Sequence, residues 1–226
     1  NCLSTIKHET IYYPNKIKQI IGRLNTQNLL EKEEREAVET ITELIEYYKG
    51  IFTILSSCAA RQLEEVTFRR TTIPVQELFD AAGKYFRKVM KNRMEKIELI
   101  MEPMEAKVIG DVNQLRFLFE NLIDEALAVH EEGVIRLQAR KDNEYVRFLF
   151  TDTRREKSVT ELNQLFYPNL ARMTSGEKGE LRGTEYLICK QIIRDHDEFA
   201  GRRGCRINAE PAEGGGFTVY FTIPRR

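Results

Sequence analysis

An uninterrupted apolar stripe over residues 38–66 constrains this chain most. Its apolar side chains recur in alternating steps of three and four residues, at positions 38, 41, 45, 48, 52, 55, 59, 63 and 66. Such spacing places them along one face of a helix. No proline interrupts the segment, and Gly50 is its only glycine. We therefore predict one continuous helix over these residues.

A second, sparser apolar stripe precedes the first and is broken by Pro14. It runs through residues 6–24, and the intervening residues 27–35 are polar and charged apart from Leu29 and Leu30. Two helices joined by a short turn form a hairpin, and a lone hairpin of this size cannot cover both apolar stripes. Pairing with a second copy would complete a four-helix bundle. We therefore predict a hairpin domain over residues 1–66 that makes the protein a homodimer.

The charge balance and the cysteines exclude several classes of function. The 35 Lys and Arg residues equal the 35 Asp and Glu residues, and acids are mixed among the arginines of residues 194–206, so we expect no nucleic-acid partner. The sequence contains no run of 18 or more apolar residues, which is the length that a membrane-spanning helix needs. Its first residues also lack the basic-then-apolar pattern of a secretory signal. The four scattered cysteines have no metal-ligand spacing. We expect a cytoplasmic protein, or the cytoplasmic part of a membrane-anchored one, with no membrane contact within this segment.

Residues 67–226 mix helical and strand patterns and form the second predicted domain. Helical spacing covers residues 75–91, 112–129 and 184–195, with Pro74 suited to the first turn of the first helix and Asp111 placed to cap the second. Strand patterns cover residues 97–101, 107–109, 134–140, 145–150, 205–209 and 217–223, with turns at Asp142-Asn143 and at residues 214–216. Residues 151–180 carry few strong signals. The segregation of helices from mostly antiparallel strands predicts an α+β fold, an α/β sandwich that follows the hairpin.

Three short motifs follow one another along the chain. Ile6-Lys7-His8-Glu9 precedes Pro14; residues 111–126 include Glu120-Asn121-Leu122; and residues 183–196 lead to the strands and glycines of residues 214–224. In order and spacing they resemble the phosphoacceptor box, the N box and the last glycine box of two-component sensor histidine kinases, which have an ATPase domain of the GHKL type. The resemblance covers nearly the whole chain.

The resemblance implies that His8 is the phosphoacceptor and that Glu9 orients its ring and takes its proton. The chemistry agrees, because a neutral imidazole can attack a phosphoryl group when an adjacent base accepts its proton. Periodicity alone favours an ordinary surface histidine, and the downstream motifs reverse that preference. Pro14 stands six residues after His8, one more than in the usual box.

The same resemblance implies a site for ATP and Mg²⁺. Asn121 and Glu125, one helical turn apart, would hold the metal where the family has two amide side chains. Glu125 departs from that pattern, because it adds negative charge and cannot donate a hydrogen bond. Asp152 matches the aspartate that accepts from the adenine amino group. Phe166 matches the aromatic residue before the nucleotide lid, and Gly183 matches a glycine at the end of that lid.

The glycine boxes of this site are degenerate. Arg154 and Glu156 stand where glycines usually follow the aspartate, and Leu181 and Glu185 stand where glycines flank Gly183. Glycines let the backbone turn tightly beneath the base. Glu185 in the first turn of a helix would repel a phosphate there. The sequence therefore leaves open whether ATP binds.

Three functions are compatible with this pattern. The first is ATP-dependent autophosphorylation on His8 followed by transfer to an aspartate of a response regulator receiver domain. The second is a phosphorelay histidine phosphotransferase whose kinase-like domain does not bind ATP, which the lost glycines favour. The third is a non-catalytic pseudokinase dimer that acts as an interaction module, against which the intact His8-Glu9 pair argues. We favour the first, a protein-histidine kinase with an atypical ATP site, because four family positions are retained: Asn121, Asp152, Phe166 and Gly183.

Overall fold

The computed structural model describes residues 16–17, 19–22, 34–42, 45, 48, 68–102, 104–167 and 184–226. The chain divides into two compact units, residues 1–67 with 169–184, and residues 68–168 with 185–226. Within the first unit, residues 16–17, 19–22, 34–42, 45 and 48 are helical, as the two apolar stripes predict. The rest of the predicted hairpin lies outside the described residues, and so does its proposed dimer contact.

A five-stranded sheet forms the frame of the second unit, in the order β2-β4-β5-β7-β6. Its strands are β2 (Ile97–Met101), β4 (Gly133–Asp142), β5 (Tyr145–Asp152), β7 (Phe217–Pro224) and β6 (Ile207–Pro211). The β2–β4 pair is parallel, and the other three pairs are antiparallel. This arrangement confirms the predicted mixed α+β fold with mostly antiparallel strands.

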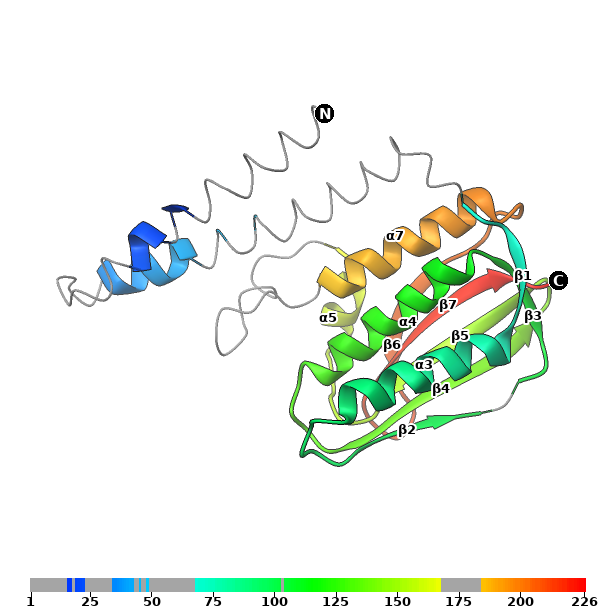
Figure 1. Cartoon of the computed structure of the whole chain (residues 1–226), viewed down its shortest axis with the longest axis horizontal. Helices are drawn as coiled ribbons and strands as arrows, with labels where there is room; N and C mark the ends of the chain where they lie inside the picture. Colours follow the sequence, from blue (N-terminus) through cyan, green and yellow to red (C-terminus); the bar gives the residue numbers. More distant parts are fainter. Residues whose placement is uncertain are drawn as a thin grey trace. The chain divides into compact units, whose positions relative to one another are not determined.

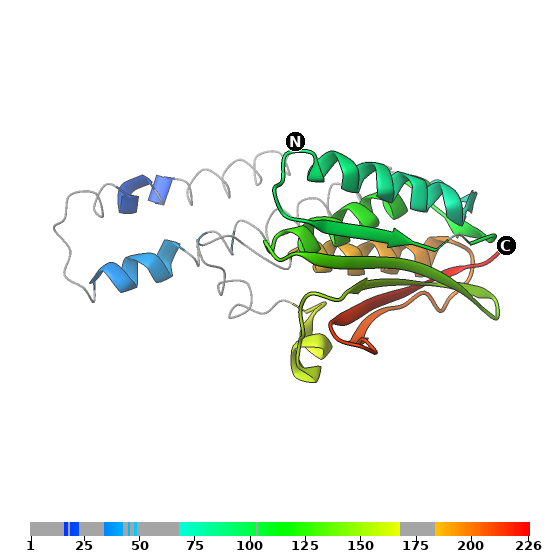
Figure 2. The same ribbon diagram turned by 90° about the horizontal axis from the view of Figure 1, so that it is seen from below.

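Three long helices cover one face of the sheet (Figures 1 and 2). They are α3 (Val75–Met90), α4 (Val112–Leu127) and α7 (Thr184–Phe199). Four aromatic side chains make the centre of the interface: Phe79 and Phe119 from the helices meet Phe148 and Phe221 from the sheet. The rings of Phe148 and Phe221 are stacked, with centroids 5.0 Å apart. Such aromatic clusters supply a large share of the apolar area that a core of this size buries.

The predicted cap of α4 is confirmed. One carboxylate oxygen of Asp111 accepts hydrogen bonds from the backbone N–H groups of Asn113 (2.9 Å) and Gln114 (3.1 Å). The other oxygen accepts from the backbone N–H of Arg69 at 2.9 Å. The side chain therefore fixes the start of the helix and ties it to the segment that enters the domain.

The predicted turn before β7 is confirmed, and the β4–β5 turn lies one residue later than predicted, at Asn143-Glu144. β4 and β5 pair in register from Ile135 opposite Asp152 to Asp142 opposite Tyr145, and Asn143 in their turn has a φ of 50°. The turn before β7 uses three glycines with positive φ, residues 214–216. At Gly216 a Cβ atom would lie 2.1 Å from the backbone oxygen of Asp152, so only glycine fits there.

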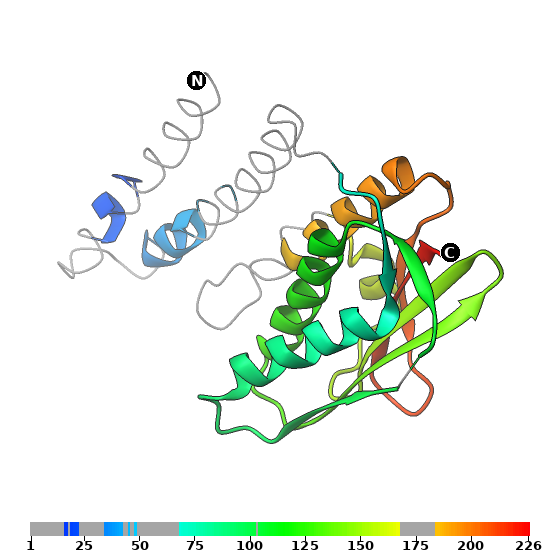
Figure 3. The ribbon, with the colours of Figure 1, turned by 45° about the vertical axis from the view of Figure 1, so that its right-hand side comes forward.

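Two local expectations need correction. Pro74 does not lie in the first turn of α3 but is its N-cap residue, in extended conformation. It ends strand β1 (Thr71–Pro74) and pairs with Lys107 of strand β3 (Lys107–Gly110). The two strands run side by side next to the start of α3 (Figure 3). The stretch with few signals contains a short helix, α5 (Val159–Gln164), started by a capping box between Ser158 and Glu161.

Helix α7 continues beyond its predicted end to Phe199, and the ring of His196 in this last turn is fully buried. The predicted helix ended at about residue 195, so the structure extends it by four residues. Among the residues that the structure describes, no helix has the length and apolarity to cross a membrane.

Candidate nucleotide site

Helix α4 carries two buried polar side chains in neighbouring turns. Asn121 and Glu125 lie one turn apart and are 5% and 6% exposed. The side-chain amide of Asn121 donates to the backbone oxygen of Phe117 at 2.7 Å. Buried carboxylates are uncommon, because removing a charge from water costs free energy that only a specific environment recovers. Their position identifies this helix face as a candidate site.

Asp152 ends strand β5 and is 1% exposed. One carboxylate oxygen accepts from the backbone N–H (3.0 Å) and the Nε–H (2.8 Å) of Arg154, and the other accepts from Arg154 Nη2 at 2.9 Å. Nη2 of Arg155 approaches that second oxygen at 3.3 Å. Both oxygens of the carboxylate thus accept hydrogen bonds from arginines, and Arg154 forms a bidentate ion pair with them.

The guanidinium of Arg154 has further partners at the end of α4. Nη2 donates to the backbone oxygen of Ala126 at 2.6 Å, and Nη1 donates to that of Glu131 at 2.9 Å. The side chain is 1% exposed. Its aliphatic part passes Gly133, where a Cβ atom would lie 2.8 Å from Arg154 Cγ. The structure therefore encloses Arg154 completely between α4, β4 and β5.

Arg155 links Asp152 to helix α4. Its Nη2 lies 3.5 Å from the backbone oxygen of Glu125 as well as 3.3 Å from Asp152. Its guanidinium lies 5.9 Å from the ring centroid of Phe217, the register partner of Asp152, and Lys157 Nζ lies 5.5 Å from the same ring. Three cationic side chains therefore surround the Asp152 end of the site.

Two aromatic side chains, Phe166 after α5 and Tyr186 of α7, line another side of the candidate site. Phe166 is 5% exposed and packs edge-on against Tyr186 of α7, with ring centroids 5.7 Å apart. Lys190 of the same helix donates from Nζ to the backbone oxygen of Phe166 at 3.3 Å and lies over the ring of Tyr167. Burial raises the pKa of Tyr186 well above its usual value, and the Glu125 carboxylate raises it further. The phenol is therefore neutral and close to Glu125.

Acidic groups gather where α4 faces the start of α7. Burial raises the pKa of Asp124, the hydroxyl hydrogen bond from Tyr85 lowers it, and the nearby Glu185 carboxylate raises it again. Burial also raises the pKa of the Cys189 thiol, and Glu185 and Glu125 add to that shift. Glu125 and Glu185 thus give this end of the site a negative field.

The structure describes four of the seven predicted site residues, and all four are buried: Asn121, Glu125, Asp152 and Phe166. The other three, His8, Glu9 and Gly183, lie outside the described residues. Arg155 bridges Asp152 to the backbone of Glu125, and Tyr186, which packs on Phe166, lies near the carboxylates of Glu125 and Asp152. Sequence reasoning identified Arg154 only as a missing glycine. Its ion pair with Asp152 was missed, although an aspartate followed by two arginines directly after a strand is a visible signal for such a pair.

The residues at the Asp152 end do not fit an adenine ring as they are arranged. An adenine amino group needs a carboxylate oxygen to accept its hydrogen bond, and both oxygens of Asp152 already accept from charged donors. For Mg²⁺, Asn121 and Glu125 offer oxygen ligands of the kind that this ion prefers. Among the described residues, no three His, Cys, Asp or Glu side chains cluster as a metal site.

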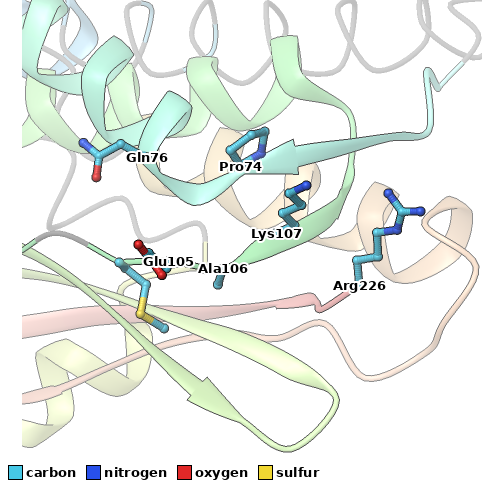
Figure 4. A pocket seen from close by; sticks show the side chains of 7 residues that line it. Pro74, Gln76, Glu105, Ala106, Lys107 and Arg226 are labelled. Carbon is cyan, nitrogen blue, oxygen red and sulfur yellow. The ribbon is translucent and has the colours of Figure 1, made fainter.

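A large surface hollow lies elsewhere in the domain. It has a volume of about 1000 Å³ and is lined by β1, the start of α3, the β2–β3 connection and the last residue, Arg226. Figure 4 shows Pro74, Gln76, Glu105, Ala106, Lys107 and Arg226 around it. None of the four site residues that the structure describes lines this hollow, so it is separate from the part of the candidate site that they form.

Comparisons with known proteins agree with the architecture. The family model described as "Histidine kinase-, DNA gyrase B-, and HSP90-like ATPase" matches residues 110–226. No curated protein matches the chain. The catalytic domain of the histidine kinase ThkA is 20% identical with a TM-score of 0.55, over 70% of this chain and 96% of that one.

Two further solved structures extend over almost the entire chain. The histidine kinase AdeS of Acinetobacter baumannii is 13% identical with a TM-score of 0.56, over 96% of this chain and 97% of that one. Full-length ShkA in complex with AMPPNP is 16% identical with a TM-score of 0.61, over 99% of this chain and 45% of that one. At such identities the likeness concerns the fold. Because the family model spans more than half of the sequence, the chain belongs to the histidine kinase-, DNA gyrase B- and HSP90-like ATPase family, and its fold is that of the histidine kinase structures above.

Proposed function

We propose that this chain is the cytoplasmic core of a sensor histidine kinase in which His8 carries the phosphate. The observation that supports this proposal best is the burial of Asn121, Glu125 and Asp152 together in a domain of this ATPase family. Residues 1–66 would form the dimeric hairpin, and residues 67–226 the kinase domain. The phosphate would pass from His8 to an aspartate on a response regulator receiver domain.

The proposed chemistry at His8 is nucleophilic. A neutral imidazole nitrogen forms a bond to phosphorus while the bond from phosphorus to the donor oxygen breaks, and Glu9 takes the ring proton. ATP with Mg²⁺ is the donor that the family implies, with Asn121 and Glu125 as the metal ligands, Phe166 beside the base and Gly183 at the phosphates. Their closeness on α4 supports a metal role for Asn121 and Glu125.

Phosphate incorporation tests this function directly. The full chain is incubated with γ-labelled ATP and Mg²⁺, and the expected label is labile in acid, stable in base and absent from His8→Ala. His130→Ala is the matched control, because His130 is a surface histidine with a 74% exposed side chain. Label that persists in His8→Ala would disprove the assignment of the phosphoacceptor.

A second candidate function is favoured by the two arginines on Asp152. If these donors exclude the base, His8 would receive its phosphate from another phosphoprotein and act as a phosphorelay histidine phosphotransferase. Incubation with a phosphorylated receiver domain in place of ATP distinguishes the two. Label that reaches His8 from the receiver but never from ATP identifies the transferase, whereas label from ATP alone identifies the kinase.

A further inference from the structure

We propose that Arg154 is a built-in occupant of the adenine-recognition position, so that the folded chain holds its nucleotide site closed until this side chain is displaced. The inference rests on the proposed function only in taking this region as the nucleotide site. It concerns nucleotide binding, which precedes any phosphoryl transfer. Its consequence is that the affinity for ATP is set by an intramolecular competitor.

The ion pair itself is the first argument. Arg154 satisfies both oxygens of Asp152, through Nε at 2.8 Å and Nη2 at 2.9 Å. A guanidinium fork matches a carboxylate with two parallel N–H bonds, which are charge-assisted and roughly twice as strong as neutral ones. The amino group of adenine is a neutral donor and offers one such bond. On this carboxylate it is the weaker competitor.

The remaining contacts of Arg154 show why the side chain stays in place. Besides the Asp152 pair, it donates to the backbone oxygens of Ala126 and Glu131, so both of its terminal nitrogens have backbone partners. Outward rotation would leave the Asp152 carboxylate, which is 1% exposed, with Arg155 as its remaining charged partner. A buried carboxylate that loses its bidentate ion pair and keeps only the longer contact to Arg155 is costly, and this cost holds the closed state.

The path of the side chain is the second argument. Gly133 has a φ of 138°, and a Cβ atom there would lie 2.8 Å from Arg154 Cγ. The glycine on β4 thus leaves room for the arginine that replaces a glycine after β5. The two positions are complementary, so the closed arrangement is accommodated by the backbone around it.

The distribution of charge is the third argument. Arg154, Arg155 and Lys157 place positive charge at the Asp152 end, where a neutral base would bind. Glu125 and Glu185 place negative charge at the other end, where the triphosphate would lie. A triphosphate therefore meets a repulsive field beside Glu125 and Glu185 unless Mg²⁺ compensates, while at the other end the base has to displace a charged competitor from Asp152.

Nucleotide titration of the full chain tests the proposal. ATP with Mg²⁺ is titrated by calorimetry into the wild-type protein, Arg154→Gly and Arg154→Lys. We expect Arg154→Gly to bind at least about tenfold more tightly than the wild type, and Arg154→Lys to fall between them because an ammonium lacks the fork. Arg147→Ala is the matched control, since it removes an arginine of β5 whose half-exposed side chain pairs with Asp142 at 3.0 Å.

Two results would overturn the proposal. One is micromolar affinity in the wild type with no gain in either Arg154 variant. The other is tightening in Arg147→Ala equal to that in the Arg154 variants. Circular dichroism checks that Arg154→Gly is folded, and if it is not, Arg154→Lys against the wild type decides. The outcome is independent of His8, because a chain that never labels His8 still reports its nucleotide affinity.

Discussion

His196 Nε2 accepts a hydrogen bond of 3.1 Å from the backbone N–H of Asp111, the residue that caps α4. The other ring nitrogen lies 2.8 Å from the backbone oxygen of Ile192, which can only accept. The imidazole is therefore neutral, with its proton on Nδ1. Through this ring the last turn of α7 holds the first turn of α4.

The neutral His196 predicts a stability that falls in acid. Burial lowers its pKa below the usual 6.5, while the Ile192 hydrogen bond and the carboxylates of Asp111 and Asp195 oppose that shift. The unfolded chain binds a proton that the folded chain excludes, so stability is complete above pH 6.5 and is lost below it. We expect the free energy of unfolding to fall by up to about 1.4 kcal/mol per pH unit there.

Urea unfolding between pH 5 and pH 8 measures this slope. His196→Leu should lower stability at pH 8 and flatten the acid slope. An unchanged slope in His196→Leu would show that other groups cause the acid sensitivity.

The cap of α4 should contribute more than the cap of α5. Asp111 is 6% exposed and holds three backbone N–H groups, so we expect Asp111→Ala to cost about 1–2 kcal/mol of unfolding free energy. Ser158 caps a short exposed helix, and Ser158→Ala should cost about 0.5 kcal/mol. Chemical denaturation of both variants gives the comparison, and equal losses would contradict it.

Alanine substitutions at Gly216 and Gly214 distinguish the cost of a positive φ from the cost of a steric clash. Both have positive φ, but a Cβ atom at Gly216 would lie 2.1 Å from the backbone oxygen of Asp152, whereas none of the described atoms lies within 4 Å at Gly214. We expect Gly214→Ala to cost about 1 kcal/mol from conformation alone. Gly216→Ala should cost several times that, on the order of 3 kcal/mol, because the start of β7 must move. Thermal unfolding measures both, and similar melting temperatures would refute the steric argument.

The Asp152–Arg154 pair should show strong coupling in stability. Arg154→Ala leaves a buried carboxylate and should cost about 3–5 kcal/mol, and Asp152→Asn should cost a comparable amount. The double variant should cost clearly less than the sum, because neither charge is then left unpaired. Urea unfolding of the four proteins completes the cycle, and additive losses would show that the two residues are energetically independent.

Much of the fold could be predicted because its signals are local. Asp111 caps α4, Asn143 and the glycines of residues 214–216 make their turns, and the apolar spacing of α4 marks its buried face. Strand β1 was missed because Pro74 is equally suited to a helix start, and its strand character depends on pairing with β3. Helix α5 was missed because a single turn depends on a capping box and not on apolar spacing.

The candidate site could be predicted only in part for a similar reason. Motif spacing identified Asn121, Glu125 and Asp152 because each position depends on its own element. The role of Arg154 depends on three elements at once, since Ala126, Gly133 and Asp152 define the space that its side chain fills. A sequence pattern within one helix or strand cannot predict a space that three elements enclose.

The spacing of the Asp152–Arg154 pair has a consequence for the order of folding. The two residues are two positions apart, whereas Phe217, which lies opposite Asp152, belongs to the last strand of the sheet. Local contacts close with little loss of chain entropy, and strands that are distant in sequence join later. As the chain leaves the ribosome, the arginine can therefore reach its carboxylate before β7 is made. On the proposal above, the pair would already be closed when β7 completes the sheet, and nucleotide binding would then begin from the closed site.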